Sequence, residues 1–194
     1  MPENQLSEQI LHQEFWENRW LEAKAGSTIY SRLDNRQKWI EYWNSISGSY
    51  SRHMCCERNI ANSIIELMRY EGIIGKESAV LDIGCGPGTF ALPMSPSVSS
   101  IVALDPAEMM LDLLLQEAKQ KSLTNISPVC TTWEDTDYSK DFDLVLAAFS
   151  TCINEADMLK KMNEASRKYA CLIGFFKTEE KVLRDELWRE IMGT

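Results

Sequence analysis

The residues best suited to chemistry lie in the run VLDIGCGPGTF, residues 80–90. An apolar, strand-like stretch reaches Asp82, and three glycines then follow at alternate positions: Gly84, Gly86 and Gly88. Because glycine has no Cβ atom, such a loop lets the backbone lie close against a nucleotide. A plain strand-to-helix turn would use the same residues, so the loop by itself leaves both interpretations open.

A second carboxylate stands at the end of the next apolar run, in IVALDPAEMM. Asp105 lies 21 residues beyond Gly84, which is about where nucleotide-binding βαβ units hold a ribose diol by paired hydrogen bonds. The alternative role is an N-cap for the next helix, which Pro106 at the first helical position would suit. Both roles are compatible, because a capping aspartate has a second oxygen to offer.

Carboxylates at strand ends need a fold that brings those ends together. From residue 79 onward, strand-like runs alternate with helical stretches, which is the pattern of a parallel sheet covered on both faces. We expect strands at residues 79–83, 101–104, 126–130, 142–149 and 169–176, and helices at 89–94, 107–121, 156–168 and 179–192. In this doubly wound α/β sheet, an αβα sandwich, the loop after the first strand lies at the switch point, where ligands bind.

The N-terminal part of the chain has a different pattern. Residues 1–75 show helical periodicity and are expected to form a cap or lid on the core at residues 76–194. Helices are predicted to begin at Ser7 and at Asp34, and a third helix is predicted to follow the run SISGSYS.

Aromatic residues of this cap are candidates for covering the site. The Gly- and Ser-rich run places Tyr50 in a turn, where its ring can contribute to a pocket. Trp39 and Trp43 either close over a ligand and exclude water or simply fasten the cap to the sheet.

Taken together, these motifs make the chain similar to class I S-adenosylmethionine-dependent methyltransferases. VLDIGCGPGTF resembles the first motif of that family, ALDPAEMM the second, CTTWED the third and DFDLVLAAFS the fourth, within residues 79–176. Dinucleotide oxidoreductases usually carry G-x-G-x-x-G instead of D-x-G-x-G-x-G, so an NAD-type oxidoreductase is the less favoured alternative. The resemblance implies a Rossmann-like core and S-adenosylmethionine as cofactor. The chain departs from the family in lacking its usual sixth and seventh strands.

The resemblance also implies roles for individual residues. Gly84 and Gly86 would run beneath the methionine part of the cofactor, and Asp82 would contact its amino group directly or through water. Asp105 would hold the ribose, and Met110 would pack on the adenine unless it is an ordinary core residue. The whole predicted cofactor-binding set is Tyr50, Asp82, Gly84, Cys85, Gly86, Gly88, Asp105, Pro106, Met110, Thr132, Trp133, Glu134 and Ala147.

The adenine end departs from the family pattern. Many relatives have an aspartate where Thr132 stands, so the adenine amino group would be bound by Glu134, a hydroxyl or water. Trp133 either covers the edge of the adenine or packs beside the sheet.

The acceptor is predicted to be a small molecule. The fourth motif contributes Ala147, Ala148 and Phe149 at the end of the strand that would face the methyl donor, without the polar Asn-Pro-Pro-Tyr-like motif of DNA amino methyltransferases. Methyl transfer is an in-line displacement that needs mainly orientation, and no catalytic base is assigned, since a lone histidine such as His53 is usually a surface residue. The alternative from another class is a cofactor-binding or regulatory subunit that needs a partner for catalysis.

The amino-acid composition limits the classes of partner that the protein is expected to bind. With 29 acidic and 20 basic residues, the net charge is -9, which disfavours nucleic acid because its binding depends on neutralising phosphates. There is no apolar run long enough to span a membrane and the N-terminus is polar, so we expect no membrane partner and a cytoplasmic protein. Six cysteines without zinc-ligand spacing indicate reduced thiols and no metal site. The edge of the fifth strand is expected to be covered by a second copy of the chain, as a homodimer, or by the N-terminal helices.

Overall fold

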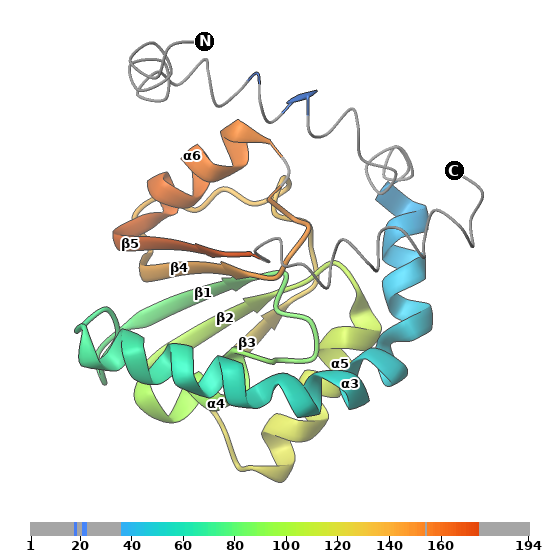
Figure 1. Ribbon diagram of the computed structural model, residues 1–194, viewed down its shortest axis with the longest axis horizontal. Helices are drawn as coiled ribbons and strands as arrows, with labels where there is room; N and C mark the ends of the chain where they lie inside the picture. Colours follow the sequence, from blue (N-terminus) through green and yellow to red (C-terminus); the bar gives the residue numbers. More distant parts are fainter. Residues whose placement is uncertain (1–17, 19–20, 23–35, 154, 175–194) are drawn as a thin grey trace, which may run out of the picture.

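Five parallel strands form a single sheet in the computed structural model, which describes residues 18, 21–22, 36–153 and 155–174. The strand order is β3-β2-β1-β4-β5 (Figure 1). Their bounds are β1 Ala79–Ile83, β2 Ser100–Leu104, β3 Ile126–Val129, β4 Phe142–Ala148 and β5 Ser166–Ile173. The order reverses between β1 and β4, so the carboxyl ends of these two strands frame the switch point. The predicted doubly wound sheet with a Rossmann-like arrangement is confirmed.

Helices cover both faces of this sheet, and the central strands β1 and β4 are therefore mostly apolar, with one aspartate each, Asp82 and Asp143. On one face, Val80 and Leu144 pack with the helices α3, α4 and α5. On the other, Leu81 and Val145 pack with α6 and with Trp133. The bounds of these elements are α3 Arg36–Tyr70, α4 Ala91–Met94, the short 3-10 helix η2 Ser95–Ser97, α5 Glu108–Gln120 and α6 Ala156–Ala165. None of the helices among the described residues is both long and apolar enough to cross a membrane.

The helix α3 is continuous over 35 residues, where the sequence predicted two helices and a turn. The hydroxyls of Ser45, Ser47 and Ser49 donate to the backbone carbonyls three residues earlier, at 2.7–2.9 Å. Serine usually competes with a helix for its backbone groups, and here that hydrogen bonding is satisfied inside the helix. Figure 1 shows α3 bending between its two halves, and Gly/Ser runs are common sites of such bends. Tyr50 is therefore held on a helix and not in a turn.

The two halves of α3 contact different parts of the protein. The second half supplies Ala61, Ile65 and Met68 to the core. The first half runs past the carboxyl ends of the strands, where Asn44 bonds to the first turn of α5. The separate cap domain predicted for residues 1–75 stays a prediction. The helices predicted to begin at Ser7 and to span residues 179–192 lie outside the described residues.

The last described strand begins earlier than predicted. Residues 166–168 were expected to end a helix, but α6 stops at Ala165 and β5 starts at Ser166. The reason is a distant partner: Asp143 on β4 pairs with Arg167 at 3.1 Å and with Lys168 at 3.2 Å. These two cations hold the pKa of Asp143 well below its usual range, together with the backbone N–H of Ala79.

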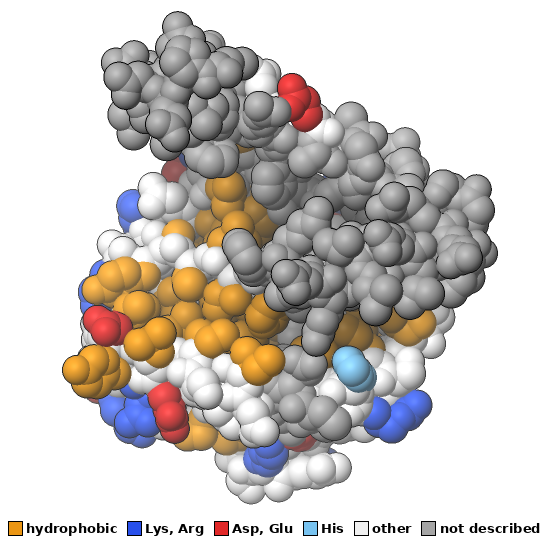
Figure 2. All heavy atoms as spheres, viewed as in Figure 1, with side chains coloured by type: hydrophobic (Ala, Val, Ile, Leu, Met, Phe, Trp, Pro, Cys, Tyr) orange, Lys and Arg blue, Asp and Glu red, His pale blue; other side chains and the backbone are white. Residues whose placement is uncertain are grey.

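The outer edge of the sheet is formed by β5. No strand among the described residues pairs with that edge, and Tyr169 and Leu172 are exposed there. Figure 2 shows hydrophobic side chains gathered between β5 and α3 on this side of the molecule. The helix α3 packs mainly on α4 and α5, so the described part of the N-terminal helices does not pair with the edge. Coverage by a second copy stays a prediction.

Candidate functional site

The glycine loop after β1 uses its three glycines in different ways. All three have positive φ angles, 65° at Gly84, 55° at Gly86 and 85° at Gly88, which side chains rarely tolerate. A Cβ on Gly84 would lie 2.1 Å from the hydroxyl oxygen of Ser150, and one on Gly88 would lie 2.8 Å from Leu92. A Cβ on Gly86 would meet nothing closer than Tyr50, at 3.9 Å. The lack of a side chain at Gly84 and Gly88 therefore lets Ser150 and Leu92 pack against the loop, whereas Gly86 borders open space.

Asp105 connects the end of β2 to this loop. One carboxylate oxygen accepts the N–H of Gly86 at 2.9 Å, and the other accepts the N–H of Ala107 at 2.8 Å. Asp105 is not the N-cap residue of α5, which is Ala107. Its carboxylate instead binds the N–H of that N-cap residue. Burial raises the pKa of Asp105, while the two backbone N–H groups act in the opposite direction. Each oxygen has a further lone pair, so Asp105 can accept bonds from a ligand as well.

Asp82 is more deeply buried and less well satisfied. Its Oδ2 atom is buried and has no hydrogen-bond partner among the described residues. Burial raises the pKa of Asp82 to about 7, the negative charge of Asp105 adds to this, and a backbone hydrogen bond from Ala91 opposes it. Because an unpartnered buried oxygen is costly, a cationic hydrogen-bond donor brought by a ligand would be strongly favoured here.

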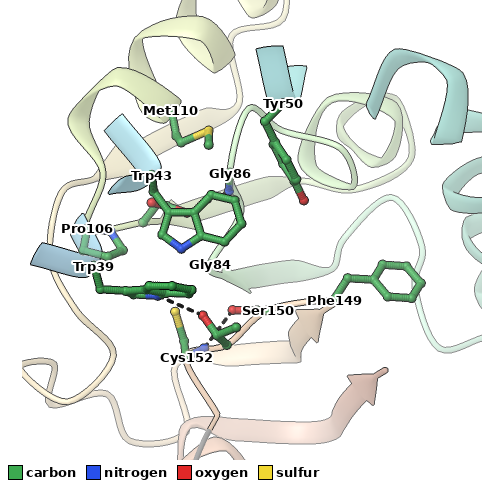
Figure 3. A pocket seen from close by; sticks show the side chains of 12 residues that line it. Trp39, Trp43, Tyr50, Gly84, Gly86, Pro106, Met110, Phe149, Ser150 and Cys152 are labelled. Atoms are coloured by element: carbon green, nitrogen blue, oxygen red, sulfur yellow. Dashed lines mark hydrogen bonds between the residues drawn. The ribbon is translucent and has the colours of Figure 1, made fainter. Parts of the chain in front are cut away.

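Three adjoining compartments extend from these carboxylates along the carboxyl ends of the strands. We name them after one residue of each, and Figure 3 shows the middle one. The Asp82 compartment is lined by Tyr50, Met54, Asp82, Gly84, Cys85, Gly86, Pro87, Thr89, Phe90, Ala148 and Phe149. The Asp105 compartment is lined by Trp39, Trp43, Tyr50, Gly84, Gly86, Asp105, Pro106, Met110, Phe149, Ser150, Thr151 and Cys152. The Glu134 compartment is lined by Arg36, Trp39, Ile40, Pro106, Thr132, Glu134, Thr151 and Cys152.

Shared lining residues show that these compartments adjoin one another, and we call the three together the trough. Tyr50, Gly84, Gly86 and Phe149 belong to both the Asp82 and the Asp105 compartments. Another four residues, Trp39, Pro106, Thr151 and Cys152, belong to both the Asp105 and the Glu134 compartments. A ligand that occupied all three compartments would be elongated, and a cationic group would be favoured at its Asp82 end.

The first half of α3 forms one wall of the trough and is held at three points. Arg36 pairs with Asp135 at 2.8 Å, the indole N–H of Trp39 donates to the Thr151 hydroxyl at 3.2 Å, and Asn44 accepts the N–H of Met109 at 2.9 Å. Between these points lie stacked and edge-on aromatic rings; the Trp39 and Trp43 centroids are 5.5 Å apart. Figure 3 shows both indoles facing the Asp105 compartment. The two tryptophans thus line the trough and also fasten the helix.

Most of the predicted site residues come together in this trough. Ten of the thirteen line one of its compartments: Tyr50, Asp82, Gly84, Cys85, Gly86, Asp105, Pro106, Met110, Thr132 and Glu134. Gly88, Trp133 and Ala147 line none of them. Ala147 and Trp133 are wholly buried in the core beneath the sheet, where the Trp133 indole donates to the Met158 carbonyl at 3.3 Å. The geometry of Trp133 matches the packing alternative, and that of Gly88 matches helix packing.

The predicted cofactor-binding set did not include the loop that follows β4. Ser150, Thr151 and Cys152 line the trough opposite α3, and Phe149 turns the chain there with a φ of 52°. The rule that ligands bind at the carboxyl ends of strands beside the switch point could have identified them. Burial raises the pKa of the Cys152 thiol to about 12, so this cysteine stays protonated near neutral pH.

Comparisons with known proteins point in one direction. A family model described as a methyltransferase domain matches residues 80–169. The chain is 37% identical over 68 residues to a ubiquinone biosynthesis O-methyltransferase of Bradyrhizobium diazoefficiens, covering 35% of this chain and 26% of that protein. It is 27% identical over 116 residues to a probable ribosomal RNA small subunit methyltransferase A of Methanosphaera stadtmanae, covering 59% of this chain and 41% of that protein.

Solved structures share the fold. The magnesium protoporphyrin IX methyltransferase of Synechocystis PCC 6803 with bound SAH matches with a TM-score of 0.65 and 15% identity, covering 79% of this chain and 78% of that one. At this identity the likeness establishes the fold alone. The chain spans only 26–42% of the length of the curated relatives it matches.

Proposed function

Starting from the match of residues 80–169 to a methyltransferase domain, we propose that the chain binds S-adenosylmethionine and methylates a small molecule. The observation that carries the proposal is the trough with its two buried carboxylates. Asp82 has an unpartnered oxygen at one end, and Asp105 lies in the middle with acceptor capacity left.

The chemical groups of the cofactor fit this order of residues. Asp82 would hold the methionine ammonium, directly or through water, and Asp105 would accept hydrogen bonds from the ribose hydroxyls. The adenine would then lie toward the Glu134 compartment, with Met110 and Thr132 near it. When bound, S-adenosylmethionine supplies an electrophilic methyl group on a positively charged sulfur.

The residues of this chain contribute orientation and exclusion of water. The glycine loop and Asp105 fix the ligand on the sheet side, and the aromatic residues of α3 cover it. Alignment of reacting groups in this way can supply roughly 7–11 kcal/mol of the barrier. No described Lys, Arg or His lines the Asp82 or the Asp105 compartment, so the acceptor is expected to bring its own lone pair.

A small-molecule acceptor agrees with the charge of the chain. The net charge of -9 opposes a polyanion, and the trough is lined by carboxylates. An RNA acceptor is the second candidate, because one relative is a probable ribosomal RNA methyltransferase.

Two measurements test the proposal. Calorimetric titration with S-adenosylhomocysteine and with NAD should show binding of the first only. Incubation with methyl-labelled S-adenosylmethionine should then transfer label to an ultrafiltered small-molecule extract and not to purified total RNA. Binding of NAD alone would exclude the methyltransferase assignment. Label in RNA alone would replace the small-molecule acceptor by RNA, and binding without any transfer would favour the cofactor-binding subunit.

A further inference from the structure

The part of the trough between the two carboxylates has aromatic walls. The Asp82 and Asp105 compartments share four residues, and two of them, Tyr50 and Phe149, are aromatic. If the proposed function holds, the ammonium lies at Asp82 and the ribose at Asp105. The sulfur lies between these two groups in the cofactor, so it falls in the segment that Tyr50 and Phe149 border.

Both rings are fixed in place by their surroundings. Tyr50 lies edge-on to Trp43, with 5.2 Å between centroids and 78° between the ring planes, and it faces Gly86 across 3.9 Å measured to the ideal Cβ position. Figure 3 shows Tyr50 extending from α3 toward the side of the pocket on which Phe149 lies.

Phe149 is held in an unusual backbone conformation. Its φ of 52° is strained for a bulky side chain. Its N–H donates to the carbonyl of Ile173 on β5 at 2.8 Å, and its ring packs on Phe90 at 6.2 Å between centroids. These contacts over-determine the turn and keep the aromatic ring beside the trough.

The charged side chains that the described part of the chain contributes to this segment are both acidic. Among the described residues that line the two compartments, the charged side chains are Asp82 and Asp105. Arg36 lines only the Glu134 compartment and is paired with Asp135. Burial raises the pKa values of both carboxyl groups. Aromatic faces and carboxylates both attract positive charge, so the two kinds of group that border this segment favour a cationic part of a ligand.

We propose that Tyr50 and Phe149 form an aromatic element that recognises the positive charge on the cofactor sulfur. Tyr50 and Phe149 thereby favour the charged methyl donor over the neutral product, which assists release of the product after transfer. Trp43 is a positioning residue that holds the Tyr50 ring. The inference rests on the proposed function and assigns these two aromatic residues a role that the shape of the trough alone does not require.

The test compares ligands that differ in charge at the sulfur. The full chain and the variants Tyr50→Leu, Tyr50→Phe and Phe149→Leu are titrated calorimetrically with three ligands. These are S-adenosylmethionine, S-adenosylhomocysteine and sinefungin, which carries an amine where the methylated sulfur stands. The leucine variants keep an apolar side chain but lack the π face, and Tyr50→Phe keeps the face but lacks the hydroxyl.

The ratio of the two dissociation constants, product over donor, is the decisive quantity. Tyr50→Leu should lower this ratio by about threefold to thirtyfold, the range that a cation–π contact provides, and Phe149→Leu should lower it in the same direction. Tyr50→Phe should leave it within a factor of two of the wild-type value. Sinefungin should follow the donor and not the product.

Each alternative outcome has a definite meaning. A ratio unchanged in both leucine variants overturns the inference, as does an equal loss of affinity for all three ligands, since that would assign the rings a role in shape only. If the wild-type chain binds neither donor nor product, the proposed function itself fails. Circular dichroism of each variant identifies one that has not folded, and the remaining leucine variant then decides.

Discussion

The carboxylate of Asp105 accepts the backbone N–H of Gly86 at 2.9 Å and so ties the end of β2 to the glycine loop after β1. The same carboxylate accepts the N–H of Ala107 just before α5. One buried side chain thus orders both backbone segments that border the middle of the trough. Its capacity to bind a ligand and its capacity to order the site cannot be separated by simple deletion.

Replacing Asp105 should therefore lower both stability and affinity. In Asp105→Asn, the carboxamide can accept only one of the two N–H groups, and its NH₂ group faces the other donor. We expect a loss of about 1–3 kcal/mol in the free energy of unfolding and a loss of at least about tenfold in affinity for S-adenosylhomocysteine. Urea unfolding and calorimetry measure the two effects. Asp112→Asn, an exposed position on α5, is the matched control, and equal behaviour of the two variants would contradict the assignment.

Asp82 should make the unliganded protein less stable as the pH rises. Its pKa is about 7 in the folded chain, against an ordinary value of 3.8 for an exposed aspartate. Between these values the folded state binds more protons than the unfolded state, so the free energy of unfolding falls as the pH increases from about 4 to 7. At pH 8 the destabilisation reaches roughly 4 kcal/mol. Asp82→Asn should remove it and raise the melting temperature at pH 8, with little change at pH 4.

The same residue should couple ligand binding to proton release. An ammonium at Asp82 favours the ionised carboxylate, so affinity for S-adenosylhomocysteine should rise by up to about tenfold per pH unit below pH 7 and then level off. Titrations at pH 6 in buffers of different ionisation enthalpy should report the released proton. A flat affinity profile in the wild type, or one unchanged in Asp82→Asn, would show that the ammonium binds elsewhere.

Alanine substitutions in the glycine loop should lower the stability of the protein by different amounts at Gly84 and Gly86. Gly86→Ala adds the strain of a left-handed alanine, about 1–2 kcal/mol, and places a methyl group in the trough facing Tyr50. Gly84→Ala adds a collision with Ser150, because the new Cβ would lie 2.1 Å from its hydroxyl oxygen. We expect the Gly84 variant to be clearly less stable to urea, and Ser150→Gly in the same chain to restore part of that stability. Equal losses for Gly84→Ala and Gly86→Ala would refute the division of roles.

The parts of the fold that local pattern determines could be predicted from the sequence. The strands at 79–83 and 142–148 are mostly apolar because both of their faces are buried, and Asp105 follows β2 at the expected distance from the loop. The parts that depend on distant partners could not. The sequence pattern places Arg167 and Lys168 at the end of a helix, but in the structure both lie on β5 and form ion pairs with Asp143.

The direction in which a side chain points could not be predicted either, where the residues on both sides of the chain have apolar surroundings. Trp133 stands beside Thr132 and Glu134, which line the trough, yet its indole points into the core. The continuity of α3 depends on serine hydroxyls bonding within the helix, and propensity alone favours a turn at such a run. The separation of Asp82, Asp105 and Glu134 among three adjoining compartments likewise emerged only from the folded chain.

The hydrogen bond between Asn44 and Met109 should hold the first half of α3 in place beside the trough. The side-chain oxygen of Asn44 accepts the N–H of Met109 at 2.9 Å, a donor in the first turn of α5 that has no partner within its own helix. Asn44→Ala removes the acceptor, and we expect a loss of about 1 kcal/mol in stability, faster hydrogen exchange at the Met109 amide and weaker binding of S-adenosylhomocysteine. Asn44→Asp keeps an acceptor and adds a negative charge near the N-terminus of α5, which is favourable, so it should retain slow exchange and affinity. If the two variants exchange at the same rate, the contact does not hold α3 in place. If Asn44→Ala exchanges faster but binds as well as the wild type, α3 opens without affecting the ligand, and its first half is scaffold and not a lid.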